Sequence, residues 1–423
     1  MTGNHSKDQV SKGAYININS FLKFRYFLDY NNPDFRFDLS HVDKQRYAHC
    51  TEDELVDLGI EKLRDVIARQ FEPGQKHVVP LSGGLDSRAI LAALLEFTDA
   101  ENIHTYTFGT PGTQDYEIGT YLATITGTDQ TCFPLTEYRY SMDELLDISR
   151  RMDHQTVLFH HPPVWELDKR YVDFVVWSGF MGDSLAGYYT PGSSAGDLNK
   201  AKKEFIVKNI YVRSIDLSDC KDDELFDLIE CDCIEKERVA LAVQLDLQNR
   251  KVKYLYPHVL LRGFNYKTPF IDSEWVDFML SIDDKYRKGQ YLYKKILIKA
   301  FPELFSVGTT ANYGVPLGAN KIKVFFKKAS IASMRAVNKF KYIFPERRLN
   351  YINFEEAIRN REDLRTIVYE NIMDLKKRKI VDWIDIDAIW RRHTGRRVDH
   401  ADALLVLASL EIHIKARGMG RLK

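Results

Sequence analysis

The sequence predicts an α/β fold in which a doubly wound parallel sheet is followed by a helical C-terminal region. Short apolar runs alternate with helical patterns before about residue 222, and the runs are KHVVPL, NIHTYTFG and YVDFVVWSG. Apolar strands that alternate with helices are typical of a parallel sheet covered on both faces. From about Asp222 onward, amphipathic helical patterns dominate and no further strand is expected.

The length of the chain predicts more than one unit of structure. With 423 residues it is longer than an ordinary domain of roughly 100–200 residues. We expect a small N-terminal appendage with a lead-in helix over residues 1–75, and the α/β domain over residues 76–423. Residues 1 to about 50, rich in aromatic side chains and Asn, are expected to form short strands and turns. Thr51 and Glu54 have the spacing of a capping box, which predicts that the lead-in helix begins there.

Charge and cysteine content exclude several classes of protein. Sixty basic residues balance sixty acidic ones, so no overall charge favours nucleic acid or an anionic membrane. The five cysteines are scattered, and the first residues do not have the pattern of a secretion signal. No apolar run approaches the roughly 18 residues that a membrane-spanning helix needs. We therefore expect a soluble cytoplasmic protein with neither a membrane nor a nucleic-acid partner.

The stretch SGGLDS follows the first apolar run and precedes an apolar helix. A strand-to-helix turn of this kind presents backbone N–H groups and the positive end of a helix dipole to an anion. Gly83 and Gly84 permit a close approach of the backbone, and the hydroxyls of Ser82 and Ser87 can donate to phosphate oxygens. Asp86 would repel a phosphate unless a divalent cation lay between them, so it indicates Mg²⁺.

This loop differs from the two most familiar phosphate-binding patterns. Neither the Walker sequence nor the dinucleotide-binding glycine pattern is present, so the loop suits a leaving pyrophosphate better than a transferred γ-phosphoryl group. SGGLDS resembles the PP-loop of the N-type ATP pyrophosphatases. Residues 50 to about 415 resemble the synthetase domain of asparagine synthetase B, through the stretches YTFGTPGTQDYEIGTYLATITGT, FVVWSGFMGDSLAGYY, NYKTPFIDSEWVDFMLSI and ANYGVPLG.

The resemblance implies a fold of the adenine nucleotide alpha hydrolase type with ATP and Mg²⁺ as cofactors. It implies that Asp86 and Asp183 hold the metal. The residues implied to bind the nucleotide are Leu81, Ser82, Gly83, Gly84, Asp86, Ser87, Phe108, Gly109, Ser178 and Gly179.

The chain also departs from that family. It does not begin with Met-Cys, and only about 75 residues precede the loop, which is too few for the glutaminase domain that supplies ammonia. A family Glu falls on Phe180, and the family's catalytic Lys falls on Thr310. Lys294 and Lys295 are candidates to replace that Lys; the alternative is that both lie on a solvated helix face.

What remains implies an AMP-forming ligase. A substrate carboxylate, or an amide oxygen, would attack the α-phosphorus of ATP, and a nitrogen nucleophile would then displace AMP from the adenylate. The implied partners are a small-molecule or peptide carboxylate and an amine or ammonia donor, with a separate glutaminase or carrier protein as a further possibility. The competing hypothesis is a nucleotide-binding family member that has lost or altered its synthetase activity.

Three other features have two interpretations each. His160 and His161 could line an acceptor pocket or belong to the core, and Cys231 with Cys233 lacks the second cysteine pair of a zinc site. Residues 321–350 carry nine Lys or Arg and one Glu among aromatic side chains. This segment is expected to be a solvated basic face or, less favourably, a surface for an anionic partner.

Overall fold

The computed structural model describes residues 11–188, 197–235, 237–341 and 351–418. A five-stranded sheet has the order β3-β2-β1-β4-β5, and every neighbouring pair is parallel. The strands are β1 (His77–Pro80), β2 (Ile103–Gly109), β3 (Asp129–Pro134), β4 (Val175–Trp177) and β5 (Asn265–Lys267). The predicted α/β class with a parallel sheet is confirmed.

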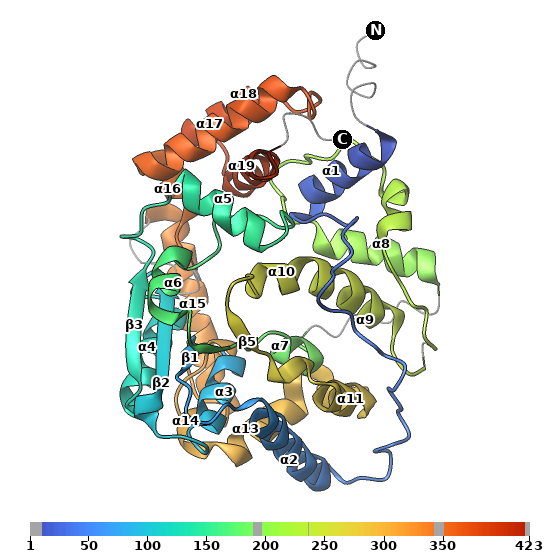
Figure 1. The fold of residues 1–423 in the computed structure, drawn as a ribbon, viewed down its shortest axis with the longest axis vertical. Coiled ribbons are helices and arrows are strands. Elements are labelled where there is room, and N and C mark those ends of the chain that lie inside the picture. Colours follow the sequence, from blue (N-terminus) through green and yellow to red (C-terminus); the bar gives the residue numbers. More distant parts are fainter. Residues whose placement is uncertain (1–10, 189–196, 236, 342–350, 419–423) are drawn as a thin grey trace.

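Helices make up most of the remaining structure (Figure 1). Those before the last strand are α1 (Lys12–Phe24), α2 (Glu52–Gln70), α3 (Asp86–Leu94), α4 (Gln114–Thr126), α5 (Met142–Arg151), α6 (Val164–Tyr171), α7 (Gly182–Leu185), α8 (Leu198–Asn209), α9 (Leu241–Leu245), the π-helical η3 (Asp246–Leu255) and α10 (Tyr256–Val259). Those after it are α11 (Ser273–Ser281), α12 (Asp284–Arg287), α13 (Tyr291–Ala300), α14 (Pro302–Phe305), α15 (Lys321–Lys341), α16 (Phe354–Asn360), α17 (Glu362–Arg378), α18 (Ile386–Thr394) and α19 (Ala401–Ala416).

Both faces of the sheet are covered, as its apolar strands require. Val78 and Val176 face a cluster that includes Leu167 and Tyr171 of α6. Val79 faces the opposite way, into the largest apolar cluster, which includes side chains of α2, α3, α11 and α13. The sheet therefore has helices on its two sides, and its carboxyl-terminal edge is left for a ligand.

The strand order reverses direction beside β1. The chain passes from β1 to β2 and β3 on one side, and returns to β4 and β5 on the other. In open parallel sheets ligands bind at such a switch point, beyond the carboxyl ends of the strands. The loop SGGLDS follows β1 directly, so it lies at this point of the sheet.

A second core surrounds α19, which is buried along nearly its whole length. Apolar side chains of α1, α5 and α17 pack around it. Figure 1 shows the N-terminal α1 beside the C-terminal helices, at the opposite end of the molecule from α2. The division of the chain near residue 75 remains a prediction, while α1 itself shares a core with the last helix.

Two sequence expectations need correction, and one strand was not predicted. Residues 1–50 include α1, a helix of 13 residues, where short strands and turns were expected. Ser11 caps it by accepting from the Ala14 N–H, and burial of Phe21 and Phe24 stabilises it despite its β-branched residues and Asn. Strand β5 lies beyond Asp222, where no strand was expected, and is only three residues long. Strand β3 was also missed because its exposed edge carries polar residues.

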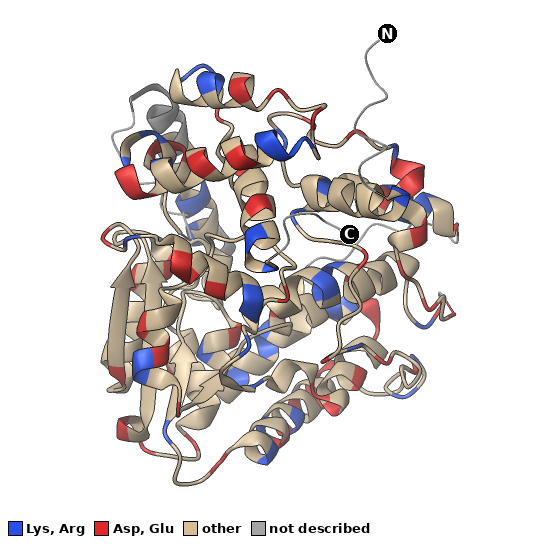
Figure 2. Ribbon diagram, turned by 45° about the horizontal axis from the view of Figure 1, so that its top comes forward, with Lys and Arg blue, Asp and Glu red and all other residues tan. Residues whose placement is uncertain are grey.

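The predicted capping box of α2 is confirmed, because Thr51 and Glu54 exchange their side-chain and backbone hydrogen bonds. Figure 2 shows basic and acidic residues interspersed along the ribbon rather than separated. The basic segment 321–350 forms α15 in part, with Phe325 and Phe326 each 67% exposed, and residues 342–350 lie outside the described structure.

Within the described ranges, no helix has both the length and the apolarity that crossing a bilayer requires.

Candidate active site

The loop after β1 is packed tightly against neighbouring segments. The N–H of Thr310 donates to the carbonyl oxygen of Gly83 over 2.9 Å. A Cβ atom on Gly83 would come within 2.6 Å of the Thr310 Cγ2 atom and 3.2 Å of the Gln114 carbonyl oxygen. Glycine is therefore required here by space, since the backbone of Gly83 is not in the left-handed region.

The polar groups of the loop hold one another in place. The Ser82 and Ser87 hydroxyl oxygens are 3.2 Å apart, and the Gly84 N–H donates to the Ser82 hydroxyl over 3.2 Å. The Gly83 N–H donates to a carboxylate oxygen of Asp115 over 3.0 Å, and burial raises the pKa of Asp115. The loop is thus ordered by its own hydroxyls and by one carboxylate from α4.

Asp86 and Asp183 come together across two strand ends. The Asp183 N–H donates to Asp86 Oδ2 over 2.9 Å, and the Tyr293 hydroxyl donates to Asp86 Oδ1 over 2.8 Å. Gly182 makes this approach possible, because a Cβ there would lie 2.4 Å from Asp86 Cγ. Burial, and then the charge of Asp183, raise the pKa of Asp86 to about 8. Two carboxylates in such a site favour a cation.

The donor set of this pair fits Mg²⁺. Magnesium in nucleotide sites is held by one or two carboxylates, with phosphate and water oxygens completing the shell. Across the described residues, no group of three or more His, Cys, Asp or Glu side chains is arranged to hold a metal. A metal held by Asp86 and Asp183 would accordingly depend on oxygens from a bound nucleotide.

The strand ends on either side of β1 bring the other predicted nucleotide residues to the same edge. Phe108 and Gly109 end β2, which pairs with β1, and Ser178 and Gly179 follow β4, on the other side of β1. A Cβ on Gly179 would lie 2.9 Å from that of Asp86 and 3.2 Å from the Ser87 nitrogen. Gly179 therefore lies directly against the start of α3.

Lys251 is a site residue that sequence reasoning missed. It lies on η3 with a side chain only 2% exposed, and its ammonium group donates to the Ser184 hydroxyl, one residue after Asp183. Its Nζ is also 3.9 Å from Asp246 Oδ2. Burial lowers the pKa of Lys251 to about 8, while the charges of Asp246, Asp183 and Asp86 act in the opposite direction. No motif in the sequence marks this lysine, because it reaches Ser184 only through the tertiary fold.

Lys294 and Lys295 make their contacts elsewhere. The Lys294 ammonium donates to the Gly289 carbonyl oxygen over 2.8 Å, and the exposed Lys295 pairs with Glu52 of α2. Tyr293 is the residue of α13 that contacts Asp86. Successive helical residues point about 100° apart, so the two lysines after Tyr293 are directed away from that contact.

Phe180 and Thr310 both lie near the loop. By the resemblance, the family has a Glu at the position of Phe180 and its catalytic Lys at the position of Thr310. Phe180 is buried, with its ring 5.8 Å from that of Tyr256. Thr310 packs on Gly83 as described above. Neither side chain carries a group that could hold a charge, whereas the buried ammonium of Lys251 interacts electrostatically with both Asp86 and Asp183.

The remaining sequence candidates lie in different surroundings. His160 and His161 are buried with His258, whose ring is 4.5 Å from that of His161, and burial lowers the pKa values of His160 and His161 to about 3. Their place in an acceptor pocket stays a prediction.

The Cys233 N–H donates to the Cys231 sulfur over 3.3 Å, and both cysteines are free thiols.

Comparison with known proteins bears on this arrangement directly. Residues 60–191 match the family model described as asparagine synthase. A search of curated proteins finds no match to this sequence. The matched range contains the loop, Asp86 and Asp183, whereas Lys251, Tyr293 and Thr310 lie outside it. Over residues 60–191 the chain is thus similar to asparagine synthase.

Proposed function

We propose that this protein is an ATP-dependent ligase that forms amide bonds and releases AMP and pyrophosphate. The observation that carries the proposal is the contact between Asp86 and Asp183, beside an SGGLDS loop at the switch point of a parallel sheet. The loop suits a pyrophosphate group, and the carboxylate pair suits the divalent cation that accompanies it. The match of residues 60–191 to asparagine synthase supports the same chemistry.

The polyphosphate of ATP would lie over the loop, where the N-terminus of α3 and the hydroxyls of Ser82 and Ser87 face it. The adenosine would lie at the neighbouring strand ends, against Phe108 and Gly109 on one side and Ser178 and Gly179 on the other. Mg²⁺, when bound, neutralises the charge of the β and γ phosphates. Asp86 and Asp183 would hold that ion, and Tyr293 orients Asp86 through its hydroxyl.

Lys251 would stabilise the negative charge that develops on the α-phosphate as pyrophosphate leaves. It is the buried cation beside the carboxylate pair, and its ammonium is held by Ser184. A preorganised cation in a water-poor site lowers the barrier to phosphoryl and adenylyl transfer through charge stabilisation. Lys251 would in this way replace the family lysine whose position is Thr310 here.

The substrates follow from the chemistry. A carboxylate, or an amide oxygen, would attack the α-phosphorus to form an adenylate with loss of pyrophosphate. An amine or ammonia would then attack the acyl carbon. The bond between that carbon and the oxygen of AMP would break, AMP would leave with the electron pair, and the nitrogen would lose a proton to solvent. A separate glutaminase could supply the ammonia, or a carrier could present the carboxylate.

A nucleotide-binding protein with no synthetase activity is the second candidate. It is favoured by Phe180 and Thr310, which stand where the family has groups that carry protons or charge. Binding of Mg²⁺-ATP without turnover in the presence of any carboxylate and amine would select this candidate.

The test is the identity of the nucleotide products after Mg²⁺-ATP is incubated with pooled cellular carboxylates and amines. We expect AMP and pyrophosphate from the wild-type protein and neither from Asp86→Ala. Asp173→Ala is the matched control, because Asp173 is exposed and precedes β4 at the opposite edge of the sheet. Formation of ADP and phosphate would contradict the proposal.

A further inference from the structure

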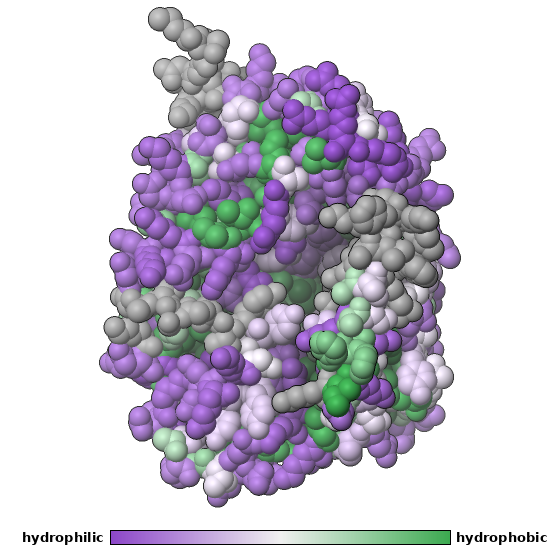
Figure 3. Space-filling model, turned by 180° about the vertical axis from the view of Figure 1, so that it is seen from behind, coloured by the Kyte–Doolittle hydropathy of each residue, from purple (hydrophilic) through white to green (hydrophobic). Residues whose placement is uncertain are grey.

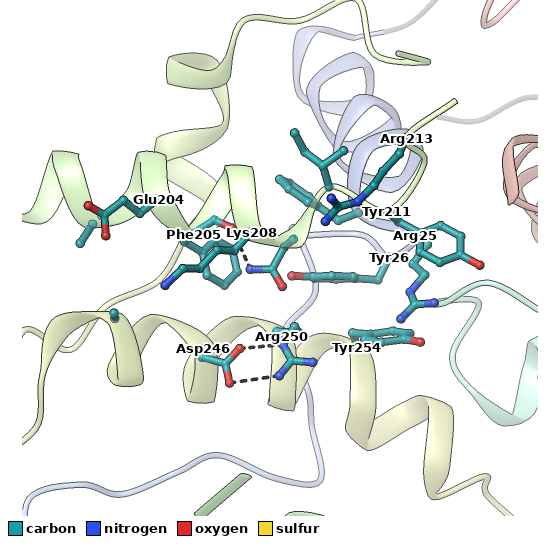
Figure 4. A pocket seen from close by; sticks show the side chains of 15 residues that line it. Arg25, Tyr26, Glu204, Phe205, Lys208, Tyr211, Arg213, Asp246, Arg250 and Tyr254 are labelled. Atoms are coloured by element: carbon teal, nitrogen blue, oxygen red, sulfur yellow. Dashed lines mark hydrogen bonds and ion pairs between the residues drawn. The ribbon is translucent and has the colours of Figure 1, made fainter. Parts of the chain in front are cut away.

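A second cavity lies outside the loop region, between the end of α1, the helix α8 and the helical stretch of α9 and η3 (Figure 4). Its volume is about 530 Å³, which is the size of a pocket for a small molecule. Aromatic rings form much of its wall, and they are Phe24, Tyr26, Phe205, Tyr211 and Tyr254. None of the predicted site residues lines it.

Arg25 lines this cavity and forms no ion pair with a described residue, although its charge acts on the carboxylate of Asp402, which accepts from the Tyr211 hydroxyl. Its guanidinium carbon lies 4.1 Å from the ring centre of Tyr211 and 4.5 Å from that of Tyr254, so it is held between two rings. Among the residues that the structure describes, its side chain has no hydrogen bond or ion pair. Stacking on aromatic rings leaves the edge of a guanidinium free to bind a carboxylate or phosphate through two N–H groups.

Tyr26 adds a hydroxyl that has no partner. The residue is 1% exposed, and its hydroxyl has no hydrogen bond among the described residues. Figure 4 shows this hydroxyl directed into the space between α8 and η3. A buried hydroxyl without a partner costs free energy, and a ligand acceptor in the cavity would remove that cost.

The other charges around the cavity also favour an anion. Lys208 and Arg213 lie on its lining, and both are exposed to solvent. Arg250 is already paired with Asp246, whose Oδ1 lies 2.6 Å from Arg250 Nε. The carboxylates on the lining are Asp246 and Glu204, and the cationic side chains of Arg25, Lys208, Arg213 and Arg250 outnumber them.

The helical segment η3 lines the cavity and also carries Lys251 of the candidate active site. Asp246 contacts Arg250 on the cavity side, and its second oxygen is 3.9 Å from the ammonium of Lys251. Lys251 in turn donates to Ser184, beside Asp183. The two sites therefore share one helical segment and stand within a few side chains of each other.

We propose that this cavity binds a small, flat oxyanion, with its carboxylate or phosphate on Arg25 and a hydrogen-bond acceptor on the Tyr26 hydroxyl. The aromatic walls contact the planar body of the ligand, and Lys208 and Arg213 attract its charge at the rim. This inference goes beyond the proposed ligase reaction and does not depend on it.

Isothermal titration with three probes tests the proposal: 4-hydroxybenzoate, 4-hydroxyphenyl phosphate and the neutral 4-hydroxybenzamide. At least one anion is expected to bind the wild-type protein at least about tenfold more tightly than the amide does. Of the two anions, the one that binds more tightly shows whether the cavity prefers a carboxylate or a phosphate. Equal binding of the amide, or no binding of either anion, would overturn the proposal.

Variants locate the binding. Arg25→Gln is expected to weaken anion binding about tenfold or more, and Tyr26→Phe, which keeps the ring, several-fold. Arg139→Gln is the matched control, because Arg139 is 76% exposed and lies outside the cavity. If Arg25→Gln does not fold, Tyr26→Phe with Arg213→Gln replaces it. Anion binding that these variants leave unchanged, or that excess AMP displaces completely, would place the anion elsewhere and refute the inference.

Discussion

Lys251 provides a buried positive charge where the sequence offered only Lys294 and Lys295. Replacement by methionine keeps the apolar stem and removes the charge. We expect Lys251→Met to lower the rate of AMP formation by about 10²–10³-fold, the usual cost of removing one preorganised group that stabilises charge in the transition state. Steady-state assays of AMP release would measure the loss.

Lys294→Gln and Lys295→Gln serve as matched controls for that variant. Both lysines contact groups away from the loop, so their removal is expected to leave the rate within about twofold, as for other surface changes. A normal rate in Lys251→Met, or a large loss in Lys295→Gln, would show that the charge on the α-phosphate is stabilised by another residue.

His413 makes the stability of the protein depend on pH. It is 1% exposed on α19, its Nδ1 is 2.8 Å from the Ser149 hydroxyl, and its Nε2 is 2.7 Å from the Thr156 carbonyl oxygen. Burial lowers the pKa of His413 to about 3, below the value near 6.5 of an unfolded chain. Between pH 6.5 and pH 3, the unfolded state therefore binds a proton at His413 that the folded state does not bind. The contribution of neutral His413 to the free energy of unfolding is complete above pH 6.5 and is lost as the pH falls from there toward 3.

The variant His413→Gln should remove this contribution. Between pH 6 and pH 4.5, the free energy of unfolding of the wild-type protein should fall more steeply than that of His413→Gln, by up to ~1.4 kcal/mol per pH unit. Urea denaturation at a series of pH values measures both slopes. Parallel curves for the two proteins would mean that His413 is not the group that titrates.

The sequence predicted those residues of the site that stand in a continuous pattern. Ser82, Gly83, Gly84 and Asp86 belong to one loop, and a loop after a buried strand has a known place in a parallel sheet. Lys251 and Tyr293 are single residues on helical segments more than 150 positions away. Their helical patterns indicate a buried face but not which other element that face meets.

At the scale of elements, the loop after β1 depends on its contact with the turn at Thr310. Gly83→Ala would place its Cβ 2.6 Å from the Thr310 methyl group, and this clash is expected to cost about 1–3 kcal/mol of unfolding free energy, with a loss of ATP binding. Thr310→Ser removes that methyl group, so the double variant should recover part of the loss. Denaturation and nucleotide binding of the two single variants and the double variant form a complete cycle.

Additive effects in that cycle would contradict a direct contact between the loop and Thr310. Thr309→Ser is the matched control, because the neighbouring Thr309 is buried but contributes none of the three atoms nearest to a Cβ on Gly83. It should not rescue Gly83→Ala.

The elements that were predicted correctly have strong local patterns. Strands β1, β2 and β4 are apolar runs, and α2 begins with a capping box. Strand β5 is three residues long and pairs only with β4, so its stability comes from the sheet rather than from its own sequence. Helix α1 is similar, because tertiary burial outweighs the low helix propensity of its residues.

At the scale of the whole molecule, a core joins the two ends of the chain. Phe21 of α1 is fully buried, with its ring 4.6 Å from that of Phe27 and 5.6 Å from that of His413. Phe21→Ala is expected to lower the free energy of unfolding by about 3–5 kcal/mol, the cost of a cavity in a core. Val207→Ala is the control, because Val207 is 62% exposed and should change the stability by less than about 0.5 kcal/mol.

A small effect of Phe21→Ala on global unfolding, together with early local unfolding of α1 in hydrogen exchange, would contradict a shared core. Figure 3 views the molecule from behind and shows a hollow near the centre of that face, with hydrophilic residues above it and residues of intermediate hydropathy below it. The arrangement of the long C-terminal region around the sheet could not be predicted from the sequence. Helical patterns with apolar faces do not specify which faces meet.

The most direct test of the central claim is the fate of oxygen from the substrate carboxylate. Pooled carboxylates labelled with ¹⁸O would be incubated with Mg²⁺-ATP, amines and the protein, and the AMP would be analysed by mass spectrometry. An attack of the carboxylate on the α-phosphorus predicts AMP that carries one labelled oxygen, absent with Asp86→Ala and unchanged with Asp173→Ala. Unlabelled AMP, or label found in inorganic phosphate instead, would show that the carboxylate is not activated as an adenylate.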